Sequence, residues 1–144
     1  VIVQDADSKT ETTTDFEVKT KKSPSQGEMN DLVFALKCAK HLKSNTIVLV
    51  RDNQLLGMGC GQTSRIDACR HASEKAKQYG FDLMDAVMAS DAFFPFPDGV
   101  IEAAKAGARS VIQPGGSVKD EEVIKAADEY GLAMVLTGVR HFRH

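Results

Sequence analysis

The sequence predicts an α/β fold of three layers, in which one mixed sheet lies between two layers of helices. The first observation is that the second half of the chain reads strand, helix, strand, helix, strand. Short connections in this order favour right-handed crossovers and parallel pairing. The second observation is a pair of apolar runs, residues 46–51 and 55–59, separated by a short polar turn as in an antiparallel hairpin. Together they predict one mixed sheet.

Turn and cap residues mark the elements of the first half. Residues 16–20 alternate apolar and polar side chains, as a short strand does. Ser25, with a glutamate three residues later, forms a capping box for a helix that we expect to end at Asn45. After the hairpin, Ser64 caps a second helix, which runs through Tyr79 and stops at the glycine that follows.

Two further helices alternate with short strands in the second half. One is predicted from a cap at Asp98 to Gly107, and the other from a cap at Ser117, with an aspartate three residues later, to Gly131. Apolar strands precede, separate and follow them at residues 87–90, 109–113 and 132–136.

The length and composition of the chain limit which classes of function are possible. A chain of 144 residues suits one domain, and we expect residues 1–15 to be a flexible lead-in and residues 16–144 to be the folded unit. The net charge of −2, with both signs scattered, gives no reason to expect nucleic acid. The apolar runs are too short to span a membrane, and residues 1–15 do not resemble a signal peptide. Three cysteines, an odd number, predict reduced thiols and a cytoplasmic protein.

The most informative stretch is Ser90–Gly99, which crowds three phenylalanines between two carboxylates. Its two prolines forbid a helix and push the residues before them into extended backbone, so a stiff loop is predicted. For any single ring, packing in the core is the simpler explanation. We expect Phe94 to enter the core, and Phe93 and Phe96 to face a flat ligand.

Three segments should meet at one edge of the sheet, because ligands of open parallel sheets bind at the carboxyl ends of the strands. They are Asp91 with the aromatic loop, residues 114–117, and residues 137–138. Asp98 and the Gly116-Ser117 pair begin helices there, where free N–H groups and the helix dipole favour anions. For the glycine-rich segment by itself, a tight turn with a serine cap is the simpler explanation.

Cations lie near this edge in two places. Arg65 falls in the first turn of a helix, where its charge opposes the dipole, which suggests an anionic ligand or partner. A surface arginine without a role is the alternative. The tail, residues 138–144, combines arginines that can bind a carboxylate or phosphate with a phenylalanine that can stack, unless it is simply a solvated end.

The sequence lacks the motifs of two classes of hydrolytic enzyme. Zinc deaminases, which also place a mixed sheet between helices, need His-x-Glu and Cys-x-x-Cys. Neither motif occurs in the sequence, so zinc hydrolysis is excluded and no metal ligands are predicted. The Gly-x-Ser-x-Gly motif of serine hydrolases is also missing.

Five motifs, in this order, resemble the C-terminal lobe of the transformylase domain in the bifunctional purine-biosynthesis family. That family joins AICAR transformylase to IMP cyclohydrolase. The resemblance covers residues 16–144 and implies a cytidine-deaminase-like fold without zinc, two lobes of which form the domain. The motifs are Lys43-Ser44-Asn45, Gly59-x-Gly61-Gln62-x-Ser64-Arg65, Ser90-Asp91-Ala92-Phe93-Phe94-Pro95-Phe96, Pro114-x-Gly116-Ser117 and Arg140-His141-Phe142-Arg143-His144.

The resemblance implies a formyltransferase of de novo purine (IMP) biosynthesis, which transfers a formyl group from the cosubstrate 10-formyltetrahydrofolate to the 5-amino group of AICAR. Asn45 would orient the carboxamide or amine of AICAR, and Arg140 and Phe142 would contact the nucleotide. Phe93 would lie against the pterin and Asp98 on its polar edge, since a flat ring with a polar rim suits such neighbours. The implied folate site consists of Arg65, Ile66, Phe93, Pro95, Phe96, Asp98 and Ser117.

The resemblance also implies parts that this chain does not carry. The family's Lys-His pair, which handles the amine proton, belongs to the preceding lobe, and the cyclohydrolase domain has no counterpart here. We therefore expect one lobe of a longer enzyme, separated naturally or artificially, with weak binding and little turnover on its own. Its expected partners are the missing N-terminal lobe and, at full length, a second copy in a homodimer. No residue is assigned to the monovalent cation that some members bind.

Two positions depart from the family pattern. Pro97 and Gly99 stand where many members carry arginine and asparagine, which puts some of the folate contacts in question. An alternative function therefore stays open, namely a non-catalytic folate-binding, nucleotide-binding or assembly module. In that case the aromatic loop mainly forms the interface with a partner lobe.

Overall fold

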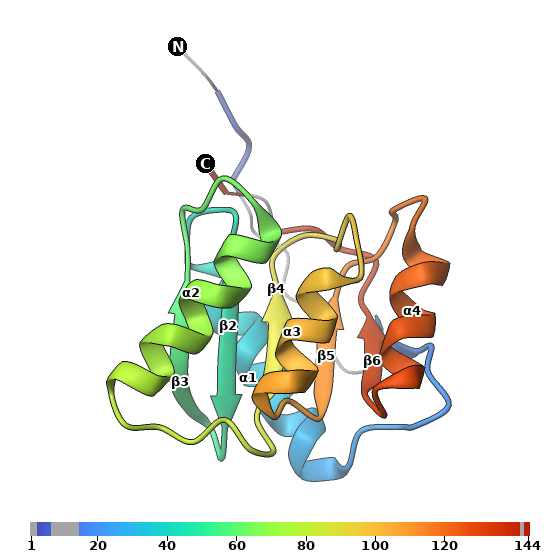
Figure 1. The fold of residues 1–144 in the computed structure, drawn as a ribbon. Coiled ribbons are helices and arrows are strands. Elements are labelled where there is room, and N and C mark those ends of the chain that lie inside the picture. Colours follow the sequence, from blue (N-terminus) through green and yellow to red (C-terminus); the bar gives the residue numbers. More distant parts are fainter. Residues whose placement is uncertain (1–2, 7–14, 142) are drawn as a thin grey trace.

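The computed structural model describes residues 3–6, 15–141 and 143–144. Among these residues, one six-stranded sheet runs in the order β1-β6-β5-β4-β2-β3 (Figure 1). Its elements follow the chain as β1 (Glu17–Val18), α1 (Gln26–Lys40), β2 (Ile47–Arg51), β3 (Gln54–Gly59), α2 (Arg65–Gln78), β4 (Val87–Ser90), α3 (Asp98–Ala106), β5 (Ser110–Gln113), α4 (Asp120–Glu129) and β6 (Ala133–Leu136).

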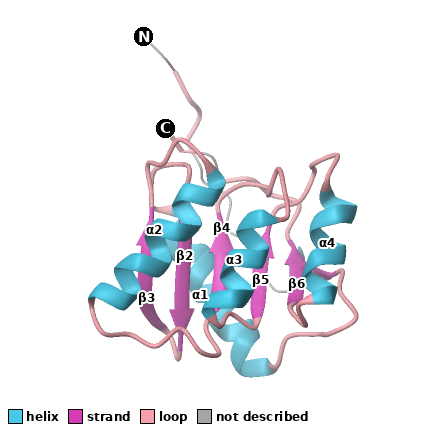
Figure 2. Cartoon of the chain, viewed as in Figure 1, coloured by secondary structure: helices cyan, strands magenta, loops and turns pink. Residues whose placement is uncertain are grey.

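The sheet lies between two layers of helices, as predicted. α1 packs on one face, and α2, α3 and α4 cover the other (Figure 2). β4, β5 and β6 are parallel, whereas β2 pairs antiparallel with both β3 and β4. The predicted αβα fold with a mixed sheet is confirmed. Its strand directions bring the carboxyl ends of β3, β4, β5 and β6 to the same edge as the start of β2.

The two N-caps predicted for the first half are confirmed. Ser25 Oγ accepts a hydrogen bond from the backbone N–H of Glu28 at 3.1 Å, and Ser64 Oγ caps α2 in the same way. The end of α1 differs from the prediction, because the helix stops at Lys40 rather than at Asn45. The reason is tertiary: Asn45 exchanges backbone hydrogen bonds with Gln62, which pulls it out of the helix and into the sheet edge.

The caps predicted at Asp98 and Ser117 are wrong. α3 begins at Asp98 itself, whose carboxylate accepts from the next backbone N–H at 2.8 Å. α4 begins only at Asp120. The Asp120 carboxylate reaches back and accepts from the backbone N–H groups of Gly116 and Ser117, at 2.7 and 3.1 Å. Because these donors are occupied, the structure agrees with the tight turn rather than with an anion site at Gly116-Ser117.

Two glycines of β3 allow α2 to lie directly against the hairpin. A Cβ atom on Gly57 or Gly59 would come within 2.2 Å of a backbone oxygen of α2, that of Ala72 or Ala68. Only a residue without a side chain permits so close an approach. This contact sets where α2 begins relative to the sheet edge, and with it the position of Arg65.

A hydrogen bond joins the two ends of the chain. The predicted lead-in, residues 1–15, lies mostly outside the described residues; within them, Gln4 Oε1 accepts from the backbone N–H of His144 at 3.2 Å.

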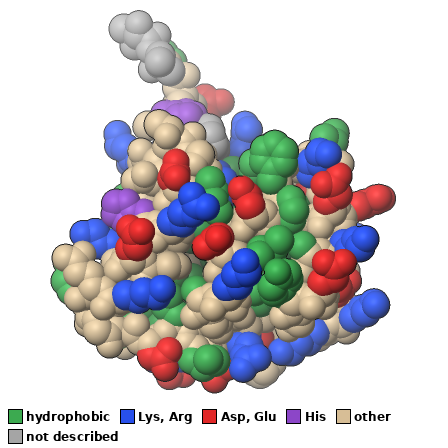
Figure 3. Space-filling view, viewed as in Figure 1, with side chains coloured by type: hydrophobic (Ala, Val, Ile, Leu, Met, Phe, Trp, Pro, Cys, Tyr) green, Lys and Arg blue, Asp and Glu red, His purple; other side chains and the backbone are tan. Residues whose placement is uncertain are grey.

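Charged side chains of both signs are interspersed over the face formed by α2, α3 and α4 (Figure 3). No helix in the described ranges is both long enough and apolar enough to cross a membrane.

Cys69 gives a first testable prediction. It is buried in the core between the sheet and α2, and burial raises the pKa of its thiol to about 12 from 9.0. Since the thiolate is the reactive form, we expect iodoacetamide at pH 8 to leave Cys69 unmodified in the folded protein and to label it in urea. Stability should also fall as the pH rises from about 9 to about 12, because only the unfolded thiol ionises there.

Peptide mass mapping after alkylation measures the first effect, with the half-buried Cys60 of the same chain as the internal control. Labelling of Cys69 at the rate of Cys60 under native conditions would contradict the burial described here.

Candidate functional site

A pocket of about 530 Å³ opens at the edge of the sheet where the strand ends meet. Its walls come from four segments far apart in the sequence: the segment that leads into β2, the start of α2, the loop after β4 and the C-terminal tail. The lining residues are Asn45, Thr63, Ser64, Arg65, Ile66, Ala92, Phe93, Pro95, Phe96, Asp98 and Arg140. The structure thus brings together most of the site residues that were predicted from the sequence.

The aromatic loop divides its rings between core and pocket in the predicted way. Phe94 is fully buried, and its backbone N–H donates to the buried Gln113 Oε1 at 3.2 Å. Phe93 and Phe96, by contrast, are 36% and 58% exposed and both line the pocket. One ring therefore anchors the loop while its two neighbours form an apolar wall.

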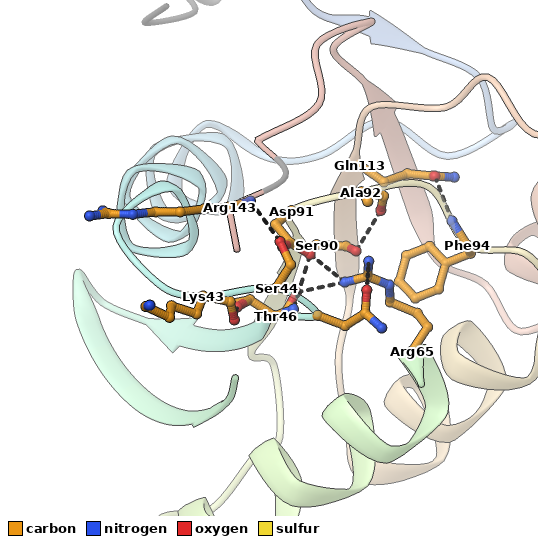
Figure 4. A network of polar contacts seen from close by, with 11 residues as sticks. Lys43, Ser44, Thr46, Arg65, Ser90, Asp91, Ala92, Phe94, Gln113 and Arg143 are labelled. Carbon is orange, nitrogen blue, oxygen red and sulfur yellow. Dashed lines mark hydrogen bonds and ion pairs between the residues drawn. The ribbon is translucent and has the colours of Figure 1, made fainter. Parts of the chain in front are cut away.

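A buried ion pair adjoins the pocket, since one of its members, Arg65, also lines the pocket; Figure 4 shows the pair and its neighbours. Asp91, which follows β4 directly, is fully buried, and its Oδ1 pairs with Nη1 of Arg65. The same carboxylate accepts from the backbone N–H of Thr46 at 3.0 Å and from Ser44 Oγ at 2.5 Å. Arg65 Nη1 also donates to the backbone oxygen of Thr46 at 3.0 Å. The start of β2, the end of β4 and the start of α2 are thereby joined.

The structure confirms the anionic partner expected for Arg65, and the alternative of a surface arginine without a role is wrong. Its position in the first turn of α2 suggested an anion outside the helix, and the structure supplies that anion from within the chain, at Asp91. Arg65 is only 7% exposed, so it is not a free surface cation. Its Nη2 donates to Oδ1 of Asn45 at 3.0 Å, which places two of the nominated residues in direct contact.

Sequence reasoning missed the structural importance of Asp91 and His141. Asp91 was noted at a strand end, but a carboxylate directly after a buried strand was the signal that it has a cationic partner. His141 is 1% exposed, and its backbone N–H donates to the backbone oxygen of Asp91 at 2.9 Å. This bond holds the tail beside the pocket, where Arg140 lines the wall.

Two nominated residues are not placed at the pocket. Ser117 lies outside it, at the start of the segment leading to α4, where its Oγ accepts from the backbone N–H of Lys119 at 3.1 Å. Phe142 is outside the described residues. Within the described residues, no three His, Cys, Asp or Glu side chains are grouped so that they could hold a metal ion.

The pocket suits a flat ligand with a polar rim. Its lining includes the exposed rings of Phe93 and Phe96 and the side-chain amide of Asn45. Aromatic side chains supply contact area to a planar ring, while a few polar groups fix its orientation. Asp98, exposed at the start of α3, adds a carboxylate at the rim that can accept hydrogen bonds from ring N–H groups.

Comparison with known proteins shows strong sequence similarity. The family model described as "AICARFT/IMPCHase bienzyme" matches residues 1–75. The chain is 55% identical to the bifunctional purine biosynthesis protein PurH of Chlorobium phaeobacteroides strain BS1 and 57% identical to that of Bacteroides thetaiotaomicron. Both alignments cover all 144 residues but only 27% and 28% of the relatives, so the chain spans little more than a quarter of their length.

Solved structures of a different family share the fold. The apo form of dCMP deaminase from cyanophage S-TIM5 superimposes with a TM-score of 0.51 at 14% identity, covering 74% of this chain and 94% of that one. Its complex with dCMP and dUMP gives 0.50 at 15% identity, covering 69% and 90%. At this identity the likeness concerns the fold alone, and it confirms the cytidine-deaminase-like architecture.

Proposed function

This chain belongs to the AICARFT/IMPCHase bienzyme family, and from that premise we propose that it is the C-terminal lobe of the transformylase domain. Its role would be to bind 10-formyltetrahydrofolate and AICAR for formyl transfer in purine biosynthesis. The pocket carries the proposal, since it joins two exposed phenylalanines to the Asn45 amide in a single cavity. The three free cysteines agree with a cytoplasmic enzyme.

Formyl transfer requires that the two reactants are held in position and that a proton is transferred. The AICAR amine attacks the formyl carbon, a new C–N bond forms, and the bond from that carbon to N10 of the folate breaks, while the amine loses a proton and N10 gains one. In our proposal Phe93 and Phe96 hold the pterin, and Asn45 and Arg140 orient AICAR. Fixing both reactants in one pocket lowers the entropic part of the barrier. Proton transfer is assigned to the remainder of the enzyme, which also completes the dimeric site.

A folate titration tests the binding part of the proposal. Adding folic acid to the 15N-labelled chain should shift the backbone amides of Ile66, Phe93 and Phe96 saturably, since these residues line the pocket. The variant Phe96→Ala should weaken the affinity about fivefold to tenfold, because one stacking ring is lost. Tyr79→Ala is the matched control, since Tyr79 is also an exposed aromatic residue, at 69%, but lies outside this pocket.

Unchanged amides around the aromatic loop at saturating folic acid would contradict the folate assignment. That outcome would favour the alternative, an assembly module whose aromatic loop contacts a partner lobe. Supplying the remainder of a PurH relative in trans and measuring formyl transfer to AICAR then separates the two functions. A folded complex that forms but stays inactive would contradict the catalytic proposal and support the assembly module.

A further inference from the structure

We propose that Asp91 is a positioning residue, which acts through Arg65 to hold the side-chain amide of Asn45 in one orientation. The amide oxygen is kept against the guanidinium, and the two amide N–H groups are left for a ligand in the pocket. This inference deepens the proposed function, on which the role of Asn45 toward AICAR rests. The geometry itself can be tested without any substrate.

The orientation of Arg65 follows from contacts with residues that flank two strands, just before β2 and just after β4. Nη1 is held by the Asp91 carboxylate and by the backbone oxygen of Thr46 at 3.0 Å, and Nη2 donates to Asn45 Oδ1 at 3.0 Å. Asp91 is in turn fixed by Ser44 Oγ and by the backbone N–H of Thr46. A planar guanidinium held at one nitrogen therefore presents its second nitrogen at a defined place.

This arrangement selects between the two orientations of the Asn45 amide. Arg65 can only donate, so the group facing it must be the amide oxygen, because the NH2 group would bring donor against donor. Within the described residues no oxygen accepts from Asn45 Nδ2. Since Asn45 lines the pocket, its N–H donors are available to a carbonyl oxygen of a bound molecule.

The consequence is a chemical preference. An amide whose oxygen is already engaged recognises an acceptor, such as the oxygen of a carboxamide or a formyl group, rather than the N–H of an amine. Burial strengthens this restraint, because Asp91 is fully buried and Arg65 is 7% exposed, so water does not compete for their contacts. Lysine could meet Asp91, but its single ammonium group could not also reach Asn45 in the same geometry.

The variant Arg65→Lys tests the inference, with Arg109→Lys as the matched control. Arg109 also pairs with an aspartate, Asp85, at 2.7 Å, but its side chain is 49% exposed and lies outside the pocket. We expect the side-chain 15N–1H2 signals of Asn45 to move beyond their linewidth and to exchange faster with solvent in Arg65→Lys. They should stay unchanged in Arg109→Lys. Signals of β5 and β6 should be the same in both variants, which shows that the fold is kept.

A second experiment tests whether this geometry matters for turnover. It uses the chain together with the remainder of a PurH relative, which is supplied in trans. Arg65→Lys should lower kcat for formyl transfer about 100-fold, because the donor is misplaced, while the KM for folate changes little. Unmoved Asn45 signals in Arg65→Lys would overturn the positioning role. Moved signals with full kcat would overturn the link from Asn45 to the reaction. A wild-type complex without turnover would instead count against the proposed function, and the Asn45 signals would still decide the positioning role.

Discussion

Replacing Asp91 by asparagine should lower the free energy of unfolding by about 3 to 5 kcal/mol, the usual effect of removing one partner from a buried ion pair. Asparagine keeps the shape of the side chain but leaves the Arg65 guanidinium, 7% exposed, without a counter-charge. The change also weakens the contacts with Ser44 and Thr46, which join the start of β2 to the end of β4. Urea denaturation followed by circular dichroism measures the effect.

The matched control is Asp85→Asn. Asp85 also pairs with an arginine, Arg109, but the two side chains are 63% and 49% exposed, so this pair should contribute at most about 1 kcal/mol. A loss from Asp91→Asn no larger than that from Asp85→Asn would show that the buried pair does not stabilise the site. If Asp91→Asn is too unstable to purify, Ser44→Ala removes one contact of the same carboxylate and should give a smaller loss in the same direction.

Phe94→Ala should be equally damaging, with an expected loss of about 3 to 5 kcal/mol, because a fully buried ring is replaced by a cavity. The ring packs against α3 so closely that a Cβ atom on Gly99 would lie 3.0 Å from it. Its removal also frees the loop that carries Phe93 and Phe96. We therefore expect weaker folic acid binding together with the lower stability.

Phe96→Ala is the control within the same loop. Its ring is 58% exposed, so the free energy of unfolding should change by no more than about 0.5 kcal/mol, although folic acid binding weakens. Equal losses of stability for Phe94→Ala and Phe96→Ala would contradict the division of the loop into one anchoring ring and two pocket rings. Chemical denaturation of both variants under the same conditions measures the difference.

The features predicted correctly have short-range causes. The caps at Ser25 and Ser64 need only one hydroxyl and a backbone N–H three residues away. The prolines restricted the backbone of the aromatic loop, and its place at the carboxyl end of a strand indicated that Phe93 and Phe96 face a ligand. The caps at Asp98 and Ser117 were wrong because the same residue types can bond in more than one way. At the start of α4, the Asp120 carboxylate takes the backbone N–H of Ser117 and places the helix start three residues later.

The sequence by itself determined the αβα architecture, the helix starts at Ser25 and Ser64, and the residues of the aromatic wall. Only the tertiary structure decided that Asp91 and Arg65, 26 positions apart, form a buried pair that holds Asn45. The physical reason is that their meeting depends on two long-range contacts. β2 must pair with β4, and α2 must lie on the bare backbone of Gly57 and Gly59 before the guanidinium reaches the carboxylate.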